Sequence, residues 1–172
     1  PYRIQMTWDT EPVNDVYLID VQSGKKEKIA TAAHGNPNLS PMGKYVYWYS
    51  LTDSAWMAWN IAKKSLVKLS NNDKVKFYDE LADSPENPNS YGFAGWSSED
   101  DYFMAYDRYD IWMLDPTGQL KPTNLTNMRA EKTEMRYIRT DPEERSIEEV
   151  KPLLLHHTNE VTKEEGYLWY DI

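Results

Sequence analysis

The chain contains one short motif four times, and this repeat constrains the fold more than any other feature. Each copy is a run of aromatic and aliphatic residues that closes with Asp or Asn. The copies are "DVYLID" at 15–20, "AWMAWN" at 55–60, "DIWMLD" at 110–115 and "YLWYD" at 167–171. Their closing residues stand 40, 55 and 56 residues apart. Self-similarity on this scale is typical of repeat architectures such as propellers.

The segments around the motif repeat as well. Upstream, "NLSPMGKYVYWYS" at 38–50 aligns with "GWSSEDDYFMAYD" at 95–107, and in both a Ser-x-x-Gly/Asp turn precedes an alternating aromatic strand. Downstream, a polar turn and a short strand that ends on an aliphatic residue follow at 21–30, 61–70 and 116–126. The repeat unit therefore has four strands, A to D, which is the make-up of a propeller blade of about 40 residues.

The pattern places strands at specific positions. In the second unit we predict strands at 36–40, 45–50, 56–61 and 66–70. In the third unit we predict them at 93–97, 102–106, 111–114 and up to Leu125. The first unit lacks strand A and has strand B at 3–8. The last unit lacks strand D, and its strands are expected at 134–138, 153–157 and 168–171.

We therefore predict an all-β chain, an arc of a β-propeller with about three to four four-stranded antiparallel blades, two of them partial. The single propeller segment, 1–172, divides into a partial blade 1–33, a blade 34–75, an inserted rim loop 76–91, a blade 92–128 and a partial blade 129–172. The polar, Pro-containing stretches 71–91 and 139–152 are expected to be rim loops. An open arc exposes strand edges and apolar faces, so we expect the isolated chain to self-associate or to be marginally stable.

Composition supports this prediction and narrows the set of partners. The chain has 13 Tyr and 7 Trp against 3 Phe, and such amphipathic rings suit half-buried sheets. The formal net charge of −9 and the lack of a long apolar run predict no nucleic-acid partner and no membrane span. The chain opens on "PYRIQMTW" without methionine or signal peptide, which predicts a processed or excised segment. The tryptophans expected in the core are Trp48, Trp56, Trp59, Trp96 and Trp112.

One charged stretch has two interpretations. In "YDRYDIWMLDP", at 106–116, Asp107, Arg108 and Asp110 could converge on a substrate as a catalytic cluster. Alternation instead favours a hairpin, with strand B ending at Tyr106, strand C beginning at Ile111 and the acids accepting backbone N–H groups of the turn.

The residues that close the motif have an architectural interpretation. A reaction needs one site rather than four, so a residue that recurs in every unit is expected to make a turn hydrogen bond after strand C. These residues are Asp20, Asn60, Asp115 and Asp171.

No metal or cofactor site is expected. Adjacent strand residues point to opposite faces, so His156 and His157 cannot chelate one ion together. The acid runs at 99–101, 143–144, 148–149 and 164–165 lack EF-hand spacing and are interpreted as solvated turns. The chain has no Cys, which excludes disulfides and thiolate ligands. The glycosylation sequons at Asn38 and Asn124 are interpreted as by-products of the repeat. We assign no catalytic, cofactor-binding or metal-ligating residue.

Two stretches resemble known proteins. "LSPMGKYVYWYS", at 39–50, resembles the turn and strand of TolB-like propeller repeats. "GWSSEDDYFMAYDRYDIWMLDPTGQLKPTNLTN", at 95–127, resembles the propeller portion of prolyl oligopeptidase family serine peptidases, in particular bacterial dipeptidyl peptidase-like members. Residues 11–25 and 151–172 fit the same propeller.

The resemblance implies a partner domain and a compartment. It implies a downstream α/β-hydrolase domain with a Ser-Asp-His triad, a peptide substrate of the parent protein, and a periplasmic or otherwise exported location. The chain itself has no G-x-S-x-G elbow. "DPEERS", at 141–146, has Glu143 and Glu144 but lacks the aromatic flanks of the family's motif for the substrate amino terminus. That role is therefore not carried over.

The sequence is compatible with functions from three different classes. The first is a non-catalytic propeller segment of a larger serine peptidase, which restricts or orients peptides through its rim loops. The alternative is a TolB-like module for protein–protein binding with no enzymatic activity. A propeller glycosidase or lyase would place acids at the inner ends of strand A, but "NPNLS" and "GFAGWS" contain none.

Overall fold

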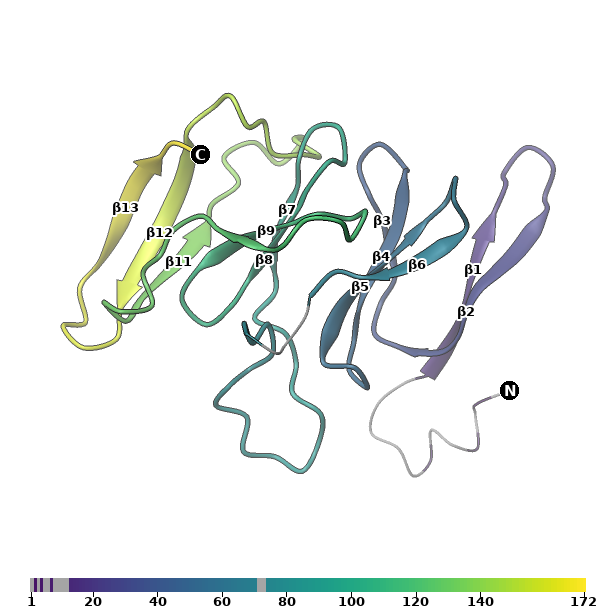
Figure 1. Ribbon diagram of the computed structural model, residues 1–172, viewed down its shortest axis with the longest axis horizontal. Coiled ribbons are helices and arrows are strands. Elements are labelled where there is room, and N and C mark those ends of the chain that lie inside the picture. The colour runs from purple at the N-terminus through teal and green to yellow at the C-terminus, as the bar shows by residue number, and fades with distance from the viewer. Residues whose placement is uncertain (1, 3, 5–6, 8–12, 71–73) are drawn as a thin grey trace.

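The computed structural model describes residues 2, 4, 7, 13–70 and 74–172. These residues form four antiparallel sheets that follow one another as a fan from the N-terminal to the C-terminal end (Figure 1). The first sheet pairs β1 (Val13–Ile19) with β2 (Lys26–His34). The second has the order β3 (Asn38–Leu39), β4 (Tyr45–Ser50), β5 (Ala55–Asn60) and β6 (Ser65–Lys68).

The third and fourth sheets continue the fan. The third runs in the order β10 (Thr123–Asn124), β9 (Ile111–Leu114), β8 (Phe103–Tyr106) and β7 (Phe93–Trp96). The fourth runs β11 (Thr133–Tyr137), β12 (Leu153–Asn159) and β13 (Glu165–Tyr170). The predicted all-β propeller arc, with two complete blades and two partial ones, is confirmed, and the observed strands fall within a few residues of the predicted positions.

Aromatic and aliphatic alternation explains why the sheets stack. In β4 every residue is buried, because Tyr45, Tyr47 and Tyr49 face the third sheet while Val46 and Trp48 face the first. A strand with neighbours on both faces buries all its side chains, whereas a half-exposed strand would bury alternate ones. Apolar clusters fill the space between each pair of neighbouring sheets, so the core is a series of three layers.

Three of the five tryptophans expected in the core are buried. Trp48, Trp56 and Trp96 lie between sheets, and Trp96 stacks on Tyr45 with ring centroids 5.3 Å apart. Trp59 and Trp112 are only partly buried and pack against the edges of two clusters.

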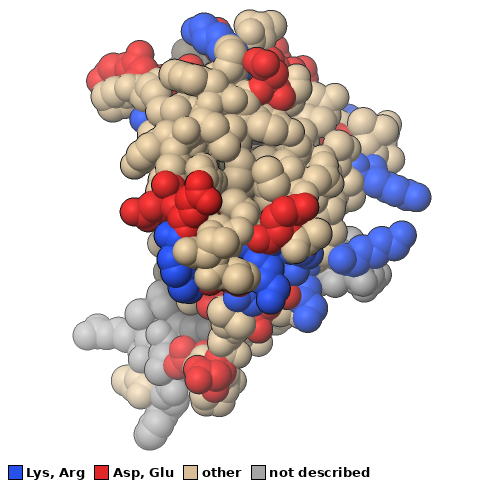
Figure 2. All heavy atoms as spheres, turned by 90° about the vertical axis from the view of Figure 1, so that its left-hand side faces the viewer, with Lys and Arg blue, Asp and Glu red and all other residues tan. Residues whose placement is uncertain are grey.

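The two ends of the fan are partial sheets, with two strands described at the first end and three at the last. The strand expected at 3–8 lies almost wholly outside the described residues. At the other end, β13 occupies the strand C position, and no fourth strand pairs with it among the residues that the structure describes. The outward face of this sheet displays Tyr167 and Trp169, which are 68% and 66% exposed. Uncharged side chains cover most of this face, with a band of charged groups below (Figure 2).

The two rim loops are more deeply anchored than their polar composition predicts. In the segment that hangs below the sheets in Figure 1, Phe77 is fully buried and lies edge-on to Trp112. In the 139–152 segment, Ile147 is buried, and its N–H donates to the Trp96 carbonyl at 2.7 Å. Each loop therefore contributes one buried apolar residue to a layer between sheets, which fixes the loop against the fold.

The first sheet carries a carboxyl with a depressed pKa. Asp15 accepts hydrogen bonds from Lys28 Nζ at 2.6 Å, from the Tyr2 hydroxyl at 2.7 Å and from the Ala32 N–H at 3.2 Å. These donors, the Lys28 ammonium above all, lower the pKa of Asp15 from 3.8 to about 2. Because they favour the ionised form, the folded state binds the proton less tightly than the unfolded chain does.

We expect this carboxyl to contribute stability above about pH 4 and to lose it as the pH falls towards 2. The Asp15→Asn variant should be less stable than the wild type at pH 6, and the gap should close towards pH 2. Urea midpoints measured at several pH values would test this. Parallel pH profiles for the two proteins would contradict it.

No helix within the described part of the chain has the length and apolar character needed to cross a membrane.

Candidate functional site

The charged stretch at 106–116 is a hairpin, as predicted. β8 ends at Tyr106 and β9 begins at Ile111. Asp107 Oδ1 accepts the N–H groups of Tyr109 and Asp110, at 2.8 and 2.6 Å. These bonds use the carboxyl to close the turn, which supports the architectural interpretation over the catalytic one.

Asp110 is fully buried and joins three segments. Its Oδ1 accepts from the Thr126 hydroxyl at 2.8 Å and from the Met128 N–H at 2.5 Å, and its Oδ2 accepts from Asn124 Nδ2 at 3.0 Å. Thr126 Oγ1 in turn accepts the Ile111 N–H at 3.1 Å. The carboxyl thus holds the end of β10 and the following turn against β9. Asn124, one of the two sequon residues, is engaged in this network, which agrees with its interpretation as a by-product of the repeat.

The prediction that 99–101 is a solvated turn is wrong for Asp100, which is 1% exposed. Asp100 lies in the β7–β8 turn and reaches across to the second sheet. Its carboxyl accepts from Ser40 Oγ at 2.5 Å, from the Met42 N–H at 3.1 Å and from the Lys44 N–H at 3.2 Å. The contact joins residues up to 60 positions apart, so it links one blade to the next.

A second polar contact links the third sheet to the fourth. Glu160, in the β12–β13 turn, accepts from Arg108 Nη2 at 2.5 Å and from the Tyr109 hydroxyl at 2.7 Å. Burial opposes ionisation of Glu160, but the hydrogen bonds from Tyr109 and Arg108 outweigh it and lower the pKa of its carboxyl. The Arg108 side chain is therefore committed to an inter-blade ion pair.

Three of the four motif-closing residues make the predicted turn bonds. Asp20 accepts from Ser23 N–H, Asn60 from Lys63 N–H and Asp115 from the N–H groups of three residues that follow it. Asp171 makes no side-chain hydrogen bond within the described residues. The architectural role is confirmed for Asp20, Asn60 and Asp115.

The adjacent histidines lie on β12 with different neighbours. The His156 ring lies 5.0 Å from the Tyr167 ring on the outward face. His157 instead packs against Gly166, where a Cβ would come within 2.9 Å of its Nε2 atom. Within the described residues no group of three or more His, Asp or Glu side chains is arranged to hold a metal ion.

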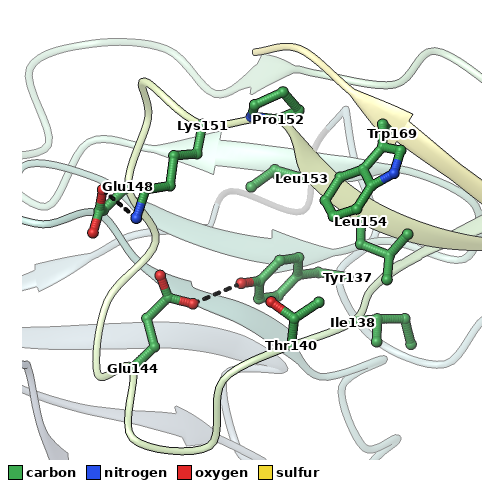
Figure 3. A pocket seen from close by; sticks show the side chains of 10 residues that line it. All are labelled: Tyr137, Ile138, Thr140, Glu144, Glu148, Lys151, Pro152, Leu153, Leu154 and Trp169. Carbon is green, nitrogen blue, oxygen red and sulfur yellow. Dashed lines mark hydrogen bonds and ion pairs between the residues drawn. The ribbon is translucent and has the colours of Figure 1, made fainter.

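A hollow of about 410 Å³ opens between the 139–152 segment and the last sheet. Its apolar wall is formed by Ile138, Leu154 and Trp169 (Figure 3). On the opposite wall the Tyr137 hydroxyl donates to Glu144 at 3.4 Å, and Lys151 pairs with Glu148 at 2.8 Å. Its ionic groups are thus largely paired with each other, and what it offers a partner is the apolar wall.

A second hollow, of about 480 Å³, lies at the inner strands β3 and β7, the strand A positions of the two complete blades. Tyr47, Phe93 and Trp96 form an aromatic wall, and the Tyr47 ring centroid lies 5.6 Å from that of Phe93 and 5.3 Å from that of Trp96. Burial raises the pKa of Tyr47, so its hydroxyl stays neutral at ordinary pH.

The 139–152 segment supplies the charged wall of this second hollow, which is the strongest candidate site of the chain. Charged residues of both signs line it. Ser40 lines it too, and its hydroxyl donates to Asp100 in the contact between the two blades. The arrangement suits binding of an extended polar ligand. The repeat alone did not predict this hollow, because it depends on where the loop docks. The charged lining residues are Arg139, Glu143, Glu144 and Arg145.

No protein-family model and no curated protein sequence matches the chain. Among solved structures, Kuenenia stuttgartiensis hydrazine synthase aligns over 90% of this chain with 11% sequence identity and a TM-score of 0.41. The chain spans 43% of the length of that structure's chain. A similarity of this size carries no argument about function.

Proposed function

We propose that this chain is a non-catalytic propeller arc of a larger serine peptidase of the prolyl oligopeptidase type, and that it restricts or orients peptides. The observation that carries the proposal is the hollow at the inner strands. It combines an aromatic wall with charged groups from an inserted loop, as a site for peptide segments requires. The resemblance of residues 95–127 to that family is the basis on which we propose the parent enzyme and its exported location.

The mechanism on this chain is steric and orienting. Strands β3 and β7 form one wall of the hollow, and Ile147 holds the loop against β7 on the other side. A peptide that passes through has to fit between these two walls. Positioning of this kind raises the rate of a reaction elsewhere by limiting the orientations of the substrate.

The test begins with the full gene product that carries this chain. We expect it to contain a G-x-S-x-G peptide, to be labelled by an active-site-directed fluorophosphonate, and to release dipeptides from fluorogenic substrates. A gene product with one propeller and no fluorophosphonate labelling would contradict the peptidase assignment.

The role of the arc is tested separately by a loop replacement. Replacing residues 140–145 by a Gly-Ser linker of equal length should raise KM for oligopeptides several-fold and leave hydrolysis of a small ester unchanged, because only large substrates meet the loop. The matched control replaces 82–87, an exposed stretch of the other loop that does not line the hollow. Equal effects of the two replacements would contradict a role for the 139–152 segment.

One observation favours the alternative of a protein-binding module. The outward face of the last sheet exposes Tyr167 and Trp169 beside Leu154, and large exposed aromatic residues are enriched where proteins bind. If the gene product has no hydrolase domain, affinity capture with wild type and Trp169→Lys would show whether a partner uses this face.

A further inference from the structure

The arginines of the described chain fall into two groups. Arg108, Arg129 and Arg136 each form an ion pair, with nitrogen–oxygen distances of 2.5 Å to Glu160, 2.7 Å to Glu80 and 3.5 Å to Glu134.

The other two, Arg139 and Arg145, are exposed and line the second hollow, the one at strands β3 and β7. Neither forms an ion pair with an acidic residue of the part of the chain that the structure describes. The chain carries 28 acidic and 19 basic residues, so acidic partners outnumber basic ones. Two guanidinium groups without an ion pair in one hollow are therefore unexpected.

The backbone that presents these arginines is held at both ends. Arg139 follows Ile138, whose N–H donates to the Leu154 carbonyl at 2.9 Å as an extension of the β11–β12 ladder. Arg145 stands two residues before the buried Ile147, which forms a parallel bridge with Ser97. The backbone on either side of the two arginines is therefore held, so a ligand that binds both guanidinium groups orders mainly their side chains.

The wall facing the arginines limits what can bind there. Tyr47, Phe93 and Trp96 offer ring surfaces, which suit an aromatic or aliphatic side chain. Guanidinium groups bind carboxylates in bidentate geometry and remain charged at every ordinary pH. A ligand that satisfies both walls carries a carboxylate close to an apolar side chain.

From these observations we propose that Arg139 and Arg145 form a subsite for a carboxylate group of a bound peptide. The inference rests on the proposed function and adds the chemical class of the ligand. Two sources share this chemistry, the C-terminal carboxylate and the side chain of Asp or Glu.

The two glutamates of the hollow distinguish a carboxylate ligand from a peptide amino terminus. Glu143 and Glu144 also line it, Glu144 accepts from the Tyr137 hydroxyl, and neither forms an ion pair with Arg139 or Arg145. Their charges repel a carboxylate ligand, whereas they would attract a peptide amino terminus. Replacing the exposed Glu143 by Gln therefore tightens binding in the first case and weakens it in the second.

Binding is measured by fluorescence anisotropy on the full gene product, treated with fluorophosphonate so that no peptide is cleaved. The probes are labelled pentapeptides of one apolar sequence in four forms. One has a free C-terminal acid and one a C-terminal amide. The other two are C-terminal amides with an internal Glu or an internal Gln. The first pair tests the terminal carboxylate as the source, and the second pair tests the acidic side chain.

Within a pair, we expect the peptide that carries the carboxylate (the acid form) to bind roughly tenfold more tightly than the peptide that carries the amide in its place. A hydrogen-bonded ion pair contributes about one order of magnitude in affinity. Arg139→Ala and Arg145→Ala should each remove most of this preference, Arg139→Lys should keep part of it, and Glu143→Gln should tighten binding of the acid form. Lys121→Ala, which removes a positive charge from an exposed loop outside the hollow, should leave the preference unchanged.

Equal affinity for the acid and amide forms in both pairs would overturn the proposal. A preference that survives the double substitution Arg139→Ala/Arg145→Ala, or weaker binding by Glu143→Gln, would overturn it as well. These readouts do not require catalysis. A gene product without peptidase activity that still prefers the acid form would therefore contradict the proposed function and leave the carboxylate subsite standing.

Discussion

Replacing Asp110 by alanine is expected to lower the free energy of unfolding by about 3–5 kcal/mol, because it removes a buried carboxyl that accepts three hydrogen bonds at once. The carboxyl is fully buried and accepts from the Thr126 hydroxyl, the Met128 N–H and the Asn124 amide. Alanine offers none of these donors a partner, and the Thr126 hydroxyl among them is buried. For a chain of this size, such a loss corresponds to a fall in Tm on the order of 10 °C.

Two further variants separate the hydrogen bonds from the loss of volume. Asp110→Asn keeps the shape and one acceptor oxygen, so it should cost about half as much as alanine. Asp115→Ala serves as the matched control, since this acid also closes a turn but is only partly buried, and it should cost about 1 kcal/mol. Urea unfolding followed by tryptophan fluorescence measures all three. Equal losses for Asp110→Ala and Asp115→Ala would show that burial adds nothing to the turn.

Much of the fold could be predicted because its information is local. The alternation in "KYVYWYS" and the recurring Asp or Asn after strand C are set by neighbours within a few residues, and they predicted the blades and their turns. The observed β4 and β5 cover almost the predicted ranges. Residues with the same role in every blade recur at equivalent positions of the repeat. They can therefore be recognised in a single sequence by comparing one repeat with the next.

The buried acids and the candidate hollow could not be predicted because they depend on contacts between blades. Asp100 finds its partners at Ser40 to Lys44, nearly 60 residues upstream, and nothing in the sequence around either segment specifies that distance. The hollow depends on Ile147, which anchors an insertion with no counterpart in the other units. One local signal was available for Asp100, because it stands where the aligned unit has Gly43.

That alignment has a conformational basis. Gly43 and Asp100 both occupy the fourth position of a turn that begins at a serine, and both have positive φ, +72° and +56°. An L-residue in this region is strained, and aspartate is among the few side chains that tolerate it. A strained residue in place of glycine is retained only where the surroundings hold it, and here the three donors of the second sheet do so.

We therefore expect Asp100→Ala to lower the free energy of unfolding by about 3–4 kcal/mol, combining the lost inter-blade bonds with the positive φ. Asp100→Gly removes the same bonds and relieves the backbone, so it should cost about 1 kcal/mol less than alanine. The neighbouring Asp101→Ala, at an exposed position, should cost little.

The difference between glycine and alanine at position 100 is the decisive quantity, because it isolates backbone strain from the contact between blades. If the carboxyl joins the blades, both variants fall well below Asp101→Ala in urea midpoint, and glycine recovers only part of the loss. Full recovery by Asp100→Gly would mean that the bonds to Ser40, Met42 and Lys44 contribute nothing and that the turn needs only a residue that accepts positive φ. Partial recovery would instead show that Asp100 does two things. It occupies a turn position that favours glycine, and its hydrogen bonds to the next blade offset the backbone strain of that position.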